Sequence, residues 1–204
     1  ACLRFGIDAA LDETDPERKD HYIHRLEEEL TRMETMLSAF LEYASIERQG
    51  ITLEKSRTNI SELAINVVDD CKPIADKSNV TLALEDNSKG IFANADAHWL
   101  YRALLNLITN GINYGETKVI IAIKLQNKQL VISVSDDGEG IPENKRKDIF
   151  KPFAKLDKSR ARCQNNFGLG LAIVSRIVDW HHGQISVTNG ENLSGANFSL
   201  KIPV

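Results

Sequence analysis

A carboxylate followed by two closely spaced glycines is the first feature of this sequence that could bind a ligand. Residues 131–135 have alternating apolar character, which predicts a half-buried strand, and Asp136 stands at its end. Gly138 and Gly140 follow, and glycine lets the backbone turn at positive φ and lets a flat ligand approach the main chain. A fixed carboxylate at the floor of a pocket can accept hydrogen bonds from an exocyclic amine such as that of adenine. The alternative is an acidic hairpin turn, because Asp-Gly is a common turn dipeptide.

Three asparagines lie on one stripe of a helix that we predict from Asp96 to Tyr114. Asn106, Asn110 and Asn113 are spaced i, i+4 and i+7, so they share one face. Asparagine costs several tenths of a kcal/mol in a helix relative to alanine, and a solvated face would more favourably use Glu, Lys or Gln. Amide oxygens suit Mg²⁺, which takes oxygen ligands and shares its shell with phosphates and waters. The opposite side of this helix is predicted to be buried through Trp99, Leu100, Ala103, Leu104, Leu107 and Ile108.

A second glycine pair opens a predicted helix from Gly168 to Trp180. Gly168 and Gly170 follow a polar loop that carries Arg160 and Arg162. Free N–H groups and the positive dipole end at a helix N-terminus suit a phosphate group. The stretch matches neither the P-loop nor the dinucleotide-binding glycine pattern, and a lone G-x-G is a weak signal.

Composition and charge limit the classes of protein to which the chain can belong. The 204 residues are 42% hydrophobic and 26% charged, as in ordinary globular proteins, and can bury a sizeable core. The net charge of −4 gives no general attraction for nucleic acid or for an anionic membrane. No apolar run approaches the ~20 residues of a membrane span, and no signal peptide is present. Three widely spaced cysteines indicate a reducing compartment, and the start at Ala1 indicates a fragment of a longer protein.

The first quarter of the chain predicts a helical hairpin. Residues 3–11 have the spacing of a helix end, and a long helix should begin with Asp15 as N-cap and Pro16 at its first position and run to about Ile46. Its apolar seam repeats every seven residues, which predicts a homodimeric four-helix bundle. An intramolecular hairpin packed on its own domain is the alternative. The seam consists of Ile23, Leu26, Leu30, Met33, Leu37, Phe40 and Ala44.

Helices and strands alternate in the rest of the chain. We predict an α+β fold, a two-layer α/β sandwich with a largely antiparallel sheet and helices on one face. The predicted strands are 80–84, 91–95, 118–124, 129–135, 184–188 and 196–202, and the predicted helices are 60–75, 96–114, a short one after Pro142, and 168–180.

Taken in order, these motifs resemble those of sensor histidine kinases. The Asn-bearing helix, D-x-G-x-G, Ile149-Phe-Lys-Pro-Phe153 and G-L-G-L are similar to the N box, first glycine box, F box and second glycine box of that family. The wider fold is shared with gyrase, MutL and the Hsp90 chaperones. The lid, the segment from Phe153 to Arg162, is most similar to RstB-type kinases. The resemblance implies a partial dimerisation and phosphoacceptor hairpin at 1–48, a connector at 49–57 and an ATP-binding catalytic domain at 58–204.

The resemblance also implies the cofactors ATP and Mg²⁺ and the residues that hold them. Asn110 would ligate Mg²⁺ with Asn106 beside it, and Asp136 would accept the adenine amine. Asn113 stands where the family usually has Lys or Arg, and Asn166 replaces a glycine of the second glycine box. The other positions implied to contact the nucleotide are Asn113, Tyr114, Gly138, Gly140, Ile141, Phe150, Phe153, Arg160, Arg162, Gly168, Leu169, Gly170 and Leu171.

By the same resemblance, the intact protein would be a protein-histidine kinase, a transferase of a two-component phosphorelay. The γ-phosphoryl of ATP would pass to a His and then to an Asp on the receiver domain of a response regulator. No His here has the phosphoacceptor context, and His98, His181 and His182 read as structural or surface residues, so the chain alone should not autophosphorylate. The chain would be the cytoplasmic portion of a bacterial inner-membrane protein, reaching the membrane only through segments outside this sequence.

Two alternatives remain open at this point. A clamp ATPase of the same fold would need a catalytic Glu early in the Asn-bearing helix, where this chain has Asp96 and His98. A non-catalytic dimeric scaffold with a vestigial site would be consistent with the Asn113 and Asn166 departures.

Overall fold

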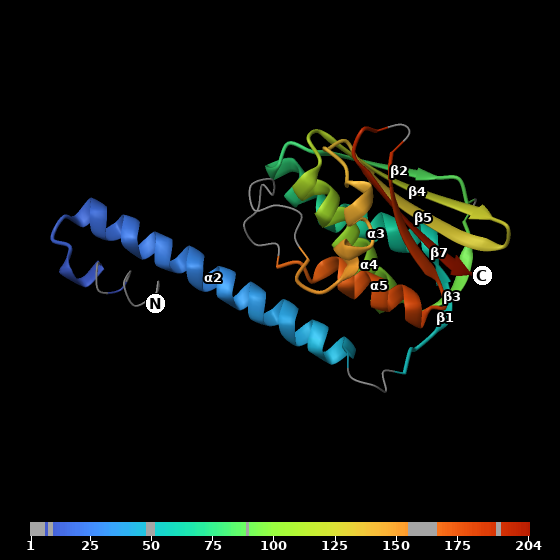
Figure 1. The fold of residues 1–204 in the computed structure, drawn as a ribbon, viewed down its shortest axis with the longest axis horizontal. Coiled ribbons are helices and arrows are strands. Elements are labelled where there is room, and N and C mark those ends of the chain that lie inside the picture. Colours follow the sequence, from blue (N-terminus) through green and yellow to red (C-terminus); the bar gives the residue numbers. More distant parts are fainter. Residues whose placement is uncertain (1–6, 8–9, 48–51, 89, 155–166, 191–192) are drawn as a thin grey trace. The chain divides into compact units, whose positions relative to one another are not determined.

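The chain forms two compact units, residues 1–45 and residues 46–204. The structure, a computed structural model, describes residues 7, 10–47, 52–88, 90–154, 167–190 and 193–204. The first unit contains most of helix α2 (Pro16–Glu47), which begins where the sequence predicts (Figure 1). Asp15 acts as its N-cap, because its Oδ1 accepts a hydrogen bond from the Glu17 N–H at 3.0 Å. Five apolar side chains of the α2 seam are more than 40% exposed in the single chain: Ile23, Leu30, Met33, Leu37 and Phe40.

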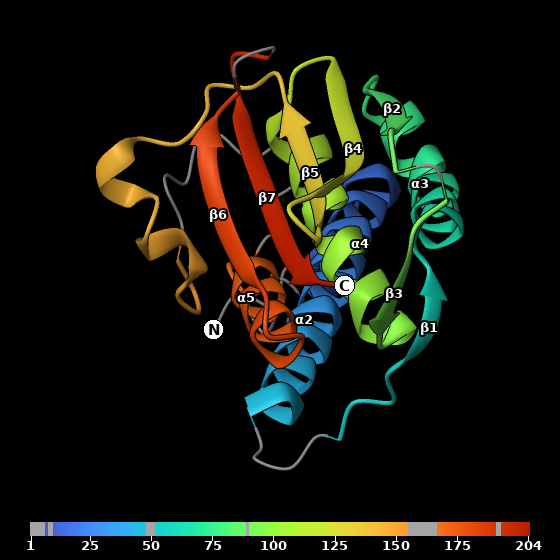
Figure 2. The same cartoon turned by 90° about the vertical axis from the view of Figure 1, so that its right-hand side faces the viewer.

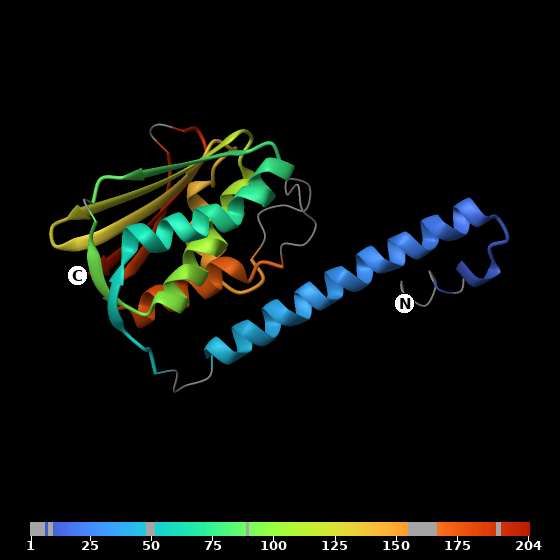
Figure 3. The ribbon, with the colours of Figure 1, turned by 180° about the vertical axis from the view of Figure 1, so that it is seen from behind.

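The second unit has two layers. A five-stranded sheet has the order β2-β4-β5-β7-β6, in which only the β2–β4 pair is parallel. Helices α3 (Ile60–Lys77), α4 (Ala97–Tyr114) and α5 (Gly170–Trp180) cover one face of it (Figure 1, Figure 3). This confirms the predicted α+β class. The strands are β2 (Thr81–Asp86), β4 (Lys118–Gln126), β5 (Gln129–Asp136), β6 (Gln184–Asn189) and β7 (Ala196–Pro203).

The structure contains a second sheet of two strands, of which only one was predicted. Strand β3 (Phe92–Ala95) lies where a strand was predicted, but its partner β1 (Ser56–Asn59) falls in the stretch read mainly as a connector. Strand β1 is only four residues long, which is too short for a periodic signal, so it could not be predicted.

The apolar stripes explain why α4 and β5 pack together. On α4, Leu100, Leu104 and Leu107 are fully buried, at the spacing that puts them on one face. Trp99, predicted on the same side, is half-buried and meets the Trp180 ring edge-on at 5.3 Å between centroids. The asparagine stripe on the opposite side is therefore turned away from the sheet.

Two boundaries near the site differ from the predicted ones. Helix α5 begins at Gly170 rather than Gly168, because Gly168 has φ +73°, which a right-handed helix excludes. The short helix after Pro142 is a pair of 3₁₀ turns, η1 (Glu143–Lys145) and η2 (Asp148–Phe150).

One buried histidine joins the ends of α4 and α5. The Nδ1 of His181 donates to the Ile177 carbonyl at 2.8 Å, so Nε2 is the acceptor for the Asp96 N–H at 3.0 Å. Asp96 in turn caps α4, accepting from the His98 N–H at 3.1 Å. Its Oδ2 accepts from the Glu54 N–H at 2.8 Å, so the segment before β1 is attached to the same point. His181 therefore has the structural role that the sequence predicts, as a neutral imidazole.

We expect the stability of the protein to depend on His181 between neutral and mildly acidic pH. Burial lowers the pKa of His181, while its bond to Ile177 opposes the shift and Lys55 adds to it. The unfolded chain binds a proton near the ordinary value of ~6.5, so the free energy of unfolding falls as pH drops below it. One proton accounts for a slope of at most about 1.4 kcal/mol per pH unit. Urea unfolding at several pH values should show this slope in the wild type and in the exposed-site control His98→Gln, and a flatter one in His181→Gln.

Candidate nucleotide site

The Asp136 carboxylate is fixed at the end of β5. The residue is 3% exposed, and its Oδ1 accepts from the N–H groups of Gly138 at 3.0 Å and Ala196 at 3.1 Å. Burial raises the pKa of Asp136, the two hydrogen bonds oppose the rise, and the charge of Asp137 adds to it. Both backbone donors end on Oδ1, which leaves the second oxygen outside this pair of bonds. A buried carboxylate held in this way can receive a donor from a bound base.

The glycines around Asp136 bring two other segments into contact with it. A Cβ on Gly138 would stand 2.2 Å from the Tyr114 carbonyl oxygen, so the turn packs directly on the C-terminal end of α4. A Cβ on Gly195 would stand 2.1 Å from Asp136 Oδ1. Glycine is required at both positions for close approach rather than for a positive φ. The structure therefore places Asp136, Gly138 and Tyr114 together, as the predicted site needs.

Asp137 holds the loop after α4. Its carboxylate accepts from the Glu116 N–H at 2.7 Å, the Thr117 N–H at 3.0 Å and the Thr117 hydroxyl. Burial acts to raise the pKa of Asp137, but the bonds from Thr117 and from the backbone of Glu116 and Lys118 outweigh it, and the pKa falls to about 2. The residue is therefore ionised at neutral pH and joins the Asp136 turn to the end of the Asn-bearing helix.

The second half of the turn is fixed by β6. Gly140 has φ +73°, and a Cβ there would stand 3.0 Å from the Oδ1 of Asn189. The same Asn189 oxygen accepts from the Ile141 N–H at 3.2 Å. Ile141 is buried, so the D-x-G-x-G segment is held at both of its ends.

The Asn stripe meets the second glycine pair. A Cβ on Gly170 would stand 3.0 Å from the Asn106 Oδ1, so any other residue there would have to displace the Asn106 amide slightly. The Asn106 Nδ2 donates to the Arg102 carbonyl at 3.0 Å. Asn110 and Asn113 lie further along the same helix and are half-buried. Within the described residues, no side chain caps the start of α5, where N–H groups without a helical partner can bind an acceptor.

The start of the lid is also built around a glycine. The Phe153 N–H donates to the Gly168 carbonyl at 2.9 Å, and a Cβ on Gly168 would stand 2.6 Å from the Ala154 carbonyl oxygen. Phe150 packs edge-on against Phe198, with 6.4 Å between the ring centroids, whereas Phe153 is 53% exposed. Leu169 is buried and Leu171 half-buried. Arg160, Arg162 and Asn166 lie outside the described residues.

Sequence reasoning missed four residues that shape this site: Asp137, Asn189, Gly195 and Ala196. Three of them lie some fifty residues or more beyond Asp136 in the sequence and reach it only through the pairing of β5 with β7 and of β7 with β6. Asp137 stood in the motif itself, and the second acidic residue of Asp-Asp-Gly was a signal that could have been used. Gly195, three residues before the buried Phe198 of β7, offered none.

Comparison with known proteins decides the family. Residues 95–204 match the family described as histidine kinase-, DNA gyrase B-, and HSP90-like ATPase. The chain belongs to this family. The match covers the Asn-bearing helix, the Asp136 turn and the pair Gly168 and Gly170, the elements that the geometry brings together.

Individual relatives are sensor histidine kinases. The chain is 31% identical to the sensor protein RstB of Escherichia coli (strain K12), over 88% of this chain and 41% of RstB. Full-length ShkA in complex with AMPPNP superposes with a TM-score of 0.76 at 26% identity, over 97% of this chain and 42% of that one. ThkA in complex with the response regulator TrrA superposes with a TM-score of 0.79 at 28% identity, over 99% of this chain and 56% of that one.

These matches identify the ATP-binding catalytic region of a sensor histidine kinase and confirm the RstB-like resemblance. The chain spans less than half the length of RstB. Among the described residues, none of the helices is long and apolar enough to cross a membrane.

Proposed function

We propose that Asp136 receives the adenine amine of ATP and that the phosphates extend toward the N-terminus of α5. The observation that carries the proposal is the Asp136 carboxylate, 3% exposed and held through one oxygen by two backbone N–H groups. Gly138 packs directly on the Tyr114 carbonyl, so the turn that carries Asp136 is held against the end of α4. At the other end, the uncapped N-terminus of α5 offers N–H groups and a positive dipole to phosphate.

Asn110 is the residue of the stripe that we assign to Mg²⁺. Asn106 lies one turn earlier, with its Nδ2 on the Arg102 carbonyl and its Oδ1 beside Gly170, where it positions α5. No three acidic, His or Cys side chains gather into a metal site in the described part of the chain. Amide oxygen, water and phosphate form a ligand set that Mg²⁺ commonly takes, and Asn110 would supply the amide oxygen. Asn113, Tyr114, Ile141, Leu169 and Leu171 would line the path between base and phosphates, with Phe150 and Phe153 anchoring the lid.

In the whole protein, this site would serve phosphoryl transfer to histidine. ATP, when bound, supplies the γ-phosphoryl group; the residues of this chain bind it, orient it and offset its charge, which is most of what such a reaction requires. Arg160 and Arg162 would add positive charge from the lid. The alternative of a clamp ATPase loses support at Asp96. Its Oδ1 accepts from the α4 backbone and its Oδ2 from Glu54, so it is a cap rather than a base for water.

Partners follow from the α2 surface and from the relatives. The exposed apolar seam of α2 supports a homodimer through residues 1–48, since five large apolar residues in one stripe need a partner. ThkA was crystallised with a response regulator, which supports a receiver domain as the phosphoryl acceptor here too. We propose that the chain lies on the cytoplasmic side of a bacterial inner-membrane protein, as the RstB relationship suggests.

Calorimetric titration with ATP, in Mg²⁺ and in EDTA, tests the metal assignment. We expect Mg²⁺ to strengthen ATP binding to the wild type and to the exposed-site control Asn144→Ala. In Asn110→Ala the gain should shrink by roughly tenfold, about 1.4 kcal/mol, because one oxygen ligand is lost. An undiminished Mg²⁺ effect in Asn110→Ala would place the ion elsewhere. Absence of ATP binding by the wild type would favour the scaffold, and sustained ATP turnover would favour the clamp ATPase.

A further inference from the structure

Strand β6 forms an unprotected edge of the five-stranded sheet. It pairs with β7 on one side, and no described strand pairs with the other (Figure 2). Edge strands are usually guarded by lysine, proline or bulges, but Gln184–Asn189 contains no charged residue and no proline. Its β-branched residues alternate with polar ones, which is the pattern of a strand ready to pair.

The backbone groups on the open side belong to Ile185 and Val187. The hairpin closes with a bond from the Gly190 N–H to the Gly195 carbonyl at 2.9 Å. Hydrogen-bonded and non-bonded pairs alternate along an antiparallel ladder, so the Ile185–Leu200 and Val187–Phe198 pairs do not exchange bonds. The N–H and C=O groups of Ile185 and Val187 therefore point out of the sheet. At the end of the strand, the Asn189 side chain already accepts a hydrogen bond from the Ile141 N–H. The open edge is therefore limited to about five residues.

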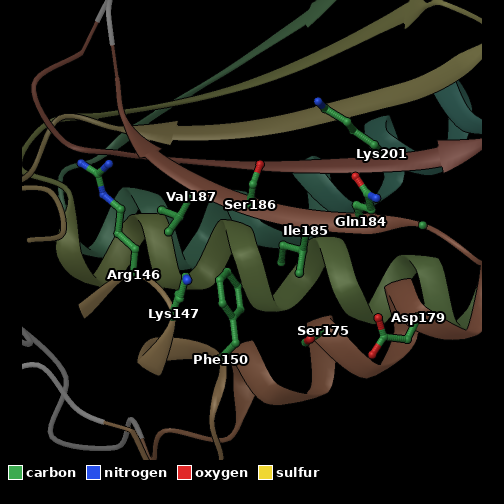
Figure 4. A pocket seen from close by; sticks show the side chains of 11 residues that line it. Arg146, Lys147, Phe150, Ser175, Asp179, Gln184, Ile185, Ser186, Val187 and Lys201 are labelled. Carbon is green, nitrogen blue, oxygen red and sulfur yellow. The ribbon is translucent and has the colours of Figure 1, made fainter. Parts of the chain in front are cut away.

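A groove runs beside this edge. Its volume is about 610 Å³, and it lies between β6, α5 and the η1–η2 segment. Ile185, Val187 and Phe150 point into it from two sides, whereas Ser186 and Lys201 lie on the other side of the strand (Figure 4). A strand added to β6 would therefore place every second side chain on an apolar surface and the others near polar groups.

The charges around the groove favour an acidic occupant. Among the described residues, Arg146 and Lys147 line its helix side against one carboxylate, Asp179, and Lys201 lies across the strand. The chain as a whole carries −4, so this is a local reversal of sign. Arg146 is held in place, because its Nε donates to the Ile141 carbonyl at 3.2 Å. Fixed positive charge beside an open strand edge selects among partners by electrostatic complementarity.

We propose that β6 binds an extended segment of a partner protein, one in which apolar residues alternate with Asp or Glu. The segment adds a sixth strand to the sheet by hydrogen bonds to Ile185 and Val187. Its apolar side chains pack on Phe150, and its carboxylates point to the face that carries Lys201, where the positive charge of Arg146 and Lys147 acts at longer range. None of Asp136, Asn110 and Gly170 lines the groove, so it lies outside the adenine and metal ends proposed above, and Phe150 is the residue that it shares with the proposed nucleotide site.

The test uses the whole 204-residue chain, labelled with ¹⁵N, and synthetic peptides of seven residues. The probe alternates valine and glutamate, and its matched control alternates valine and lysine. We expect the probe to shift the amide resonances of Ile185 and Val187 and to slow their hydrogen exchange, and the control to bind at least roughly threefold more weakly. A probe methylated on alternate backbone nitrogens should not bind.

Two variants, each with a matched control, distinguish strand pairing from electrostatic attraction alone. Ile185→Pro removes an outward N–H without touching the β7 ladder, so it should abolish peptide binding, whereas Ile185→Val should preserve it. Lys147→Glu should weaken the acidic probe roughly twofold to fivefold, and Lys145→Glu, on the same turn but outside the groove, should not.

Three results would overturn the proposal. One is an absence of shifts at Ile185 and Val187 at millimolar peptide. Another is equal binding of the valine–lysine control. The third is concentration-dependent protection of the β6 amides without peptide, which would make a second copy of the chain the occupant. ATP titration of the same variants tests the nucleotide proposal independently. A variant that no longer binds the peptide should still bind ATP.

Discussion

Replacing Asp136 by Asn should lower the affinity for ATP on the order of 100-fold while leaving the fold intact. The amide oxygen can still accept from the Gly138 and Ala196 N–H groups that now bond to Oδ1. The other half of the side chain becomes an NH₂ group, which would face the adenine amine donor to donor. Loss of a hydrogen bond to a charged group costs roughly 1.5–3 kcal/mol, which gives the expected factor. Calorimetric titration measures it.

Inosine triphosphate supplies the matched control for Asp136. Its base carries an oxygen where adenine carries the amine, so it suits an amide donor better than a carboxylate. The wild type should bind ATP much more tightly than inosine triphosphate. Asp136→Asn should lose this preference, because it binds ATP more weakly and binds inosine triphosphate equally well or better. If both nucleotides weaken equally, Asp136 shapes the pocket without reading the base, and the adenine assignment fails.

The second large effect is expected at a residue outside every motif. In Gly195→Ala the new methyl would stand 2.1 Å from Asp136 Oδ1 and 2.5 Å from the Gly138 nitrogen. Neither atom can retreat, because the two are hydrogen-bonded to each other at 3.0 Å. Overpacking of this severity should cost roughly 3 kcal/mol or more of unfolding free energy, or displace the Asp136 turn and abolish ATP binding. Urea unfolding and calorimetry together register either outcome.

Ser194→Ala is the control for Gly195. Ser194 is exposed and adjacent, and its hydroxyl makes only a long bond of 3.4 Å to the Asp137 carbonyl. We expect its stability and ATP affinity to stay close to wild type, within about 0.5 kcal/mol. If Gly195→Ala kept wild-type stability and ATP affinity, β7 would be able to move away from Asp136. Close packing by Gly195 would then not be what holds the Asp136 carboxylate in place.

Local sequence signals, such as helix caps and helical periodicity, predicted much of the fold. Asp96 and Asp15 are caps because a short acidic side chain before an apolar-periodic run can serve the first free N–H groups, and the structure has both contacts. The asparagine stripe was readable because helical periodicity alone fixes which residues share a face. Strand β1 was missed because four residues carry too little periodic pattern to outweigh a connector reading.

The contacts in the site that depend on tertiary structure could not be predicted from the sequence. Gly195, Ala196 and Asn189 act on the Asp136 turn only after β5 and β7 have paired, and β6 after them. The resemblance implies Asn106 beside the metal ligand, and the structure adds that its Oδ1 would stand 3.0 Å from a Cβ on Gly170, a proximity that depends on how α5 packs on α4. His181 was correctly expected to be structural, but its partner Asp96 lies 85 positions away.

The central claim is that one ligand bridges Asp136 and the start of α5, and amide spectra of the ¹⁵N-labelled chain test it most directly. Adenosine alone should shift the resonances of Gly138 and Ala196, while those of Gly170 and Leu171 stay in place. ATP with Mg²⁺ should shift both groups, because its phosphates reach the helix N-terminus. If ATP·Mg²⁺ leaves Gly138 and Ala196 unshifted, or moves only surface residues elsewhere, the nucleotide site is not where we place it.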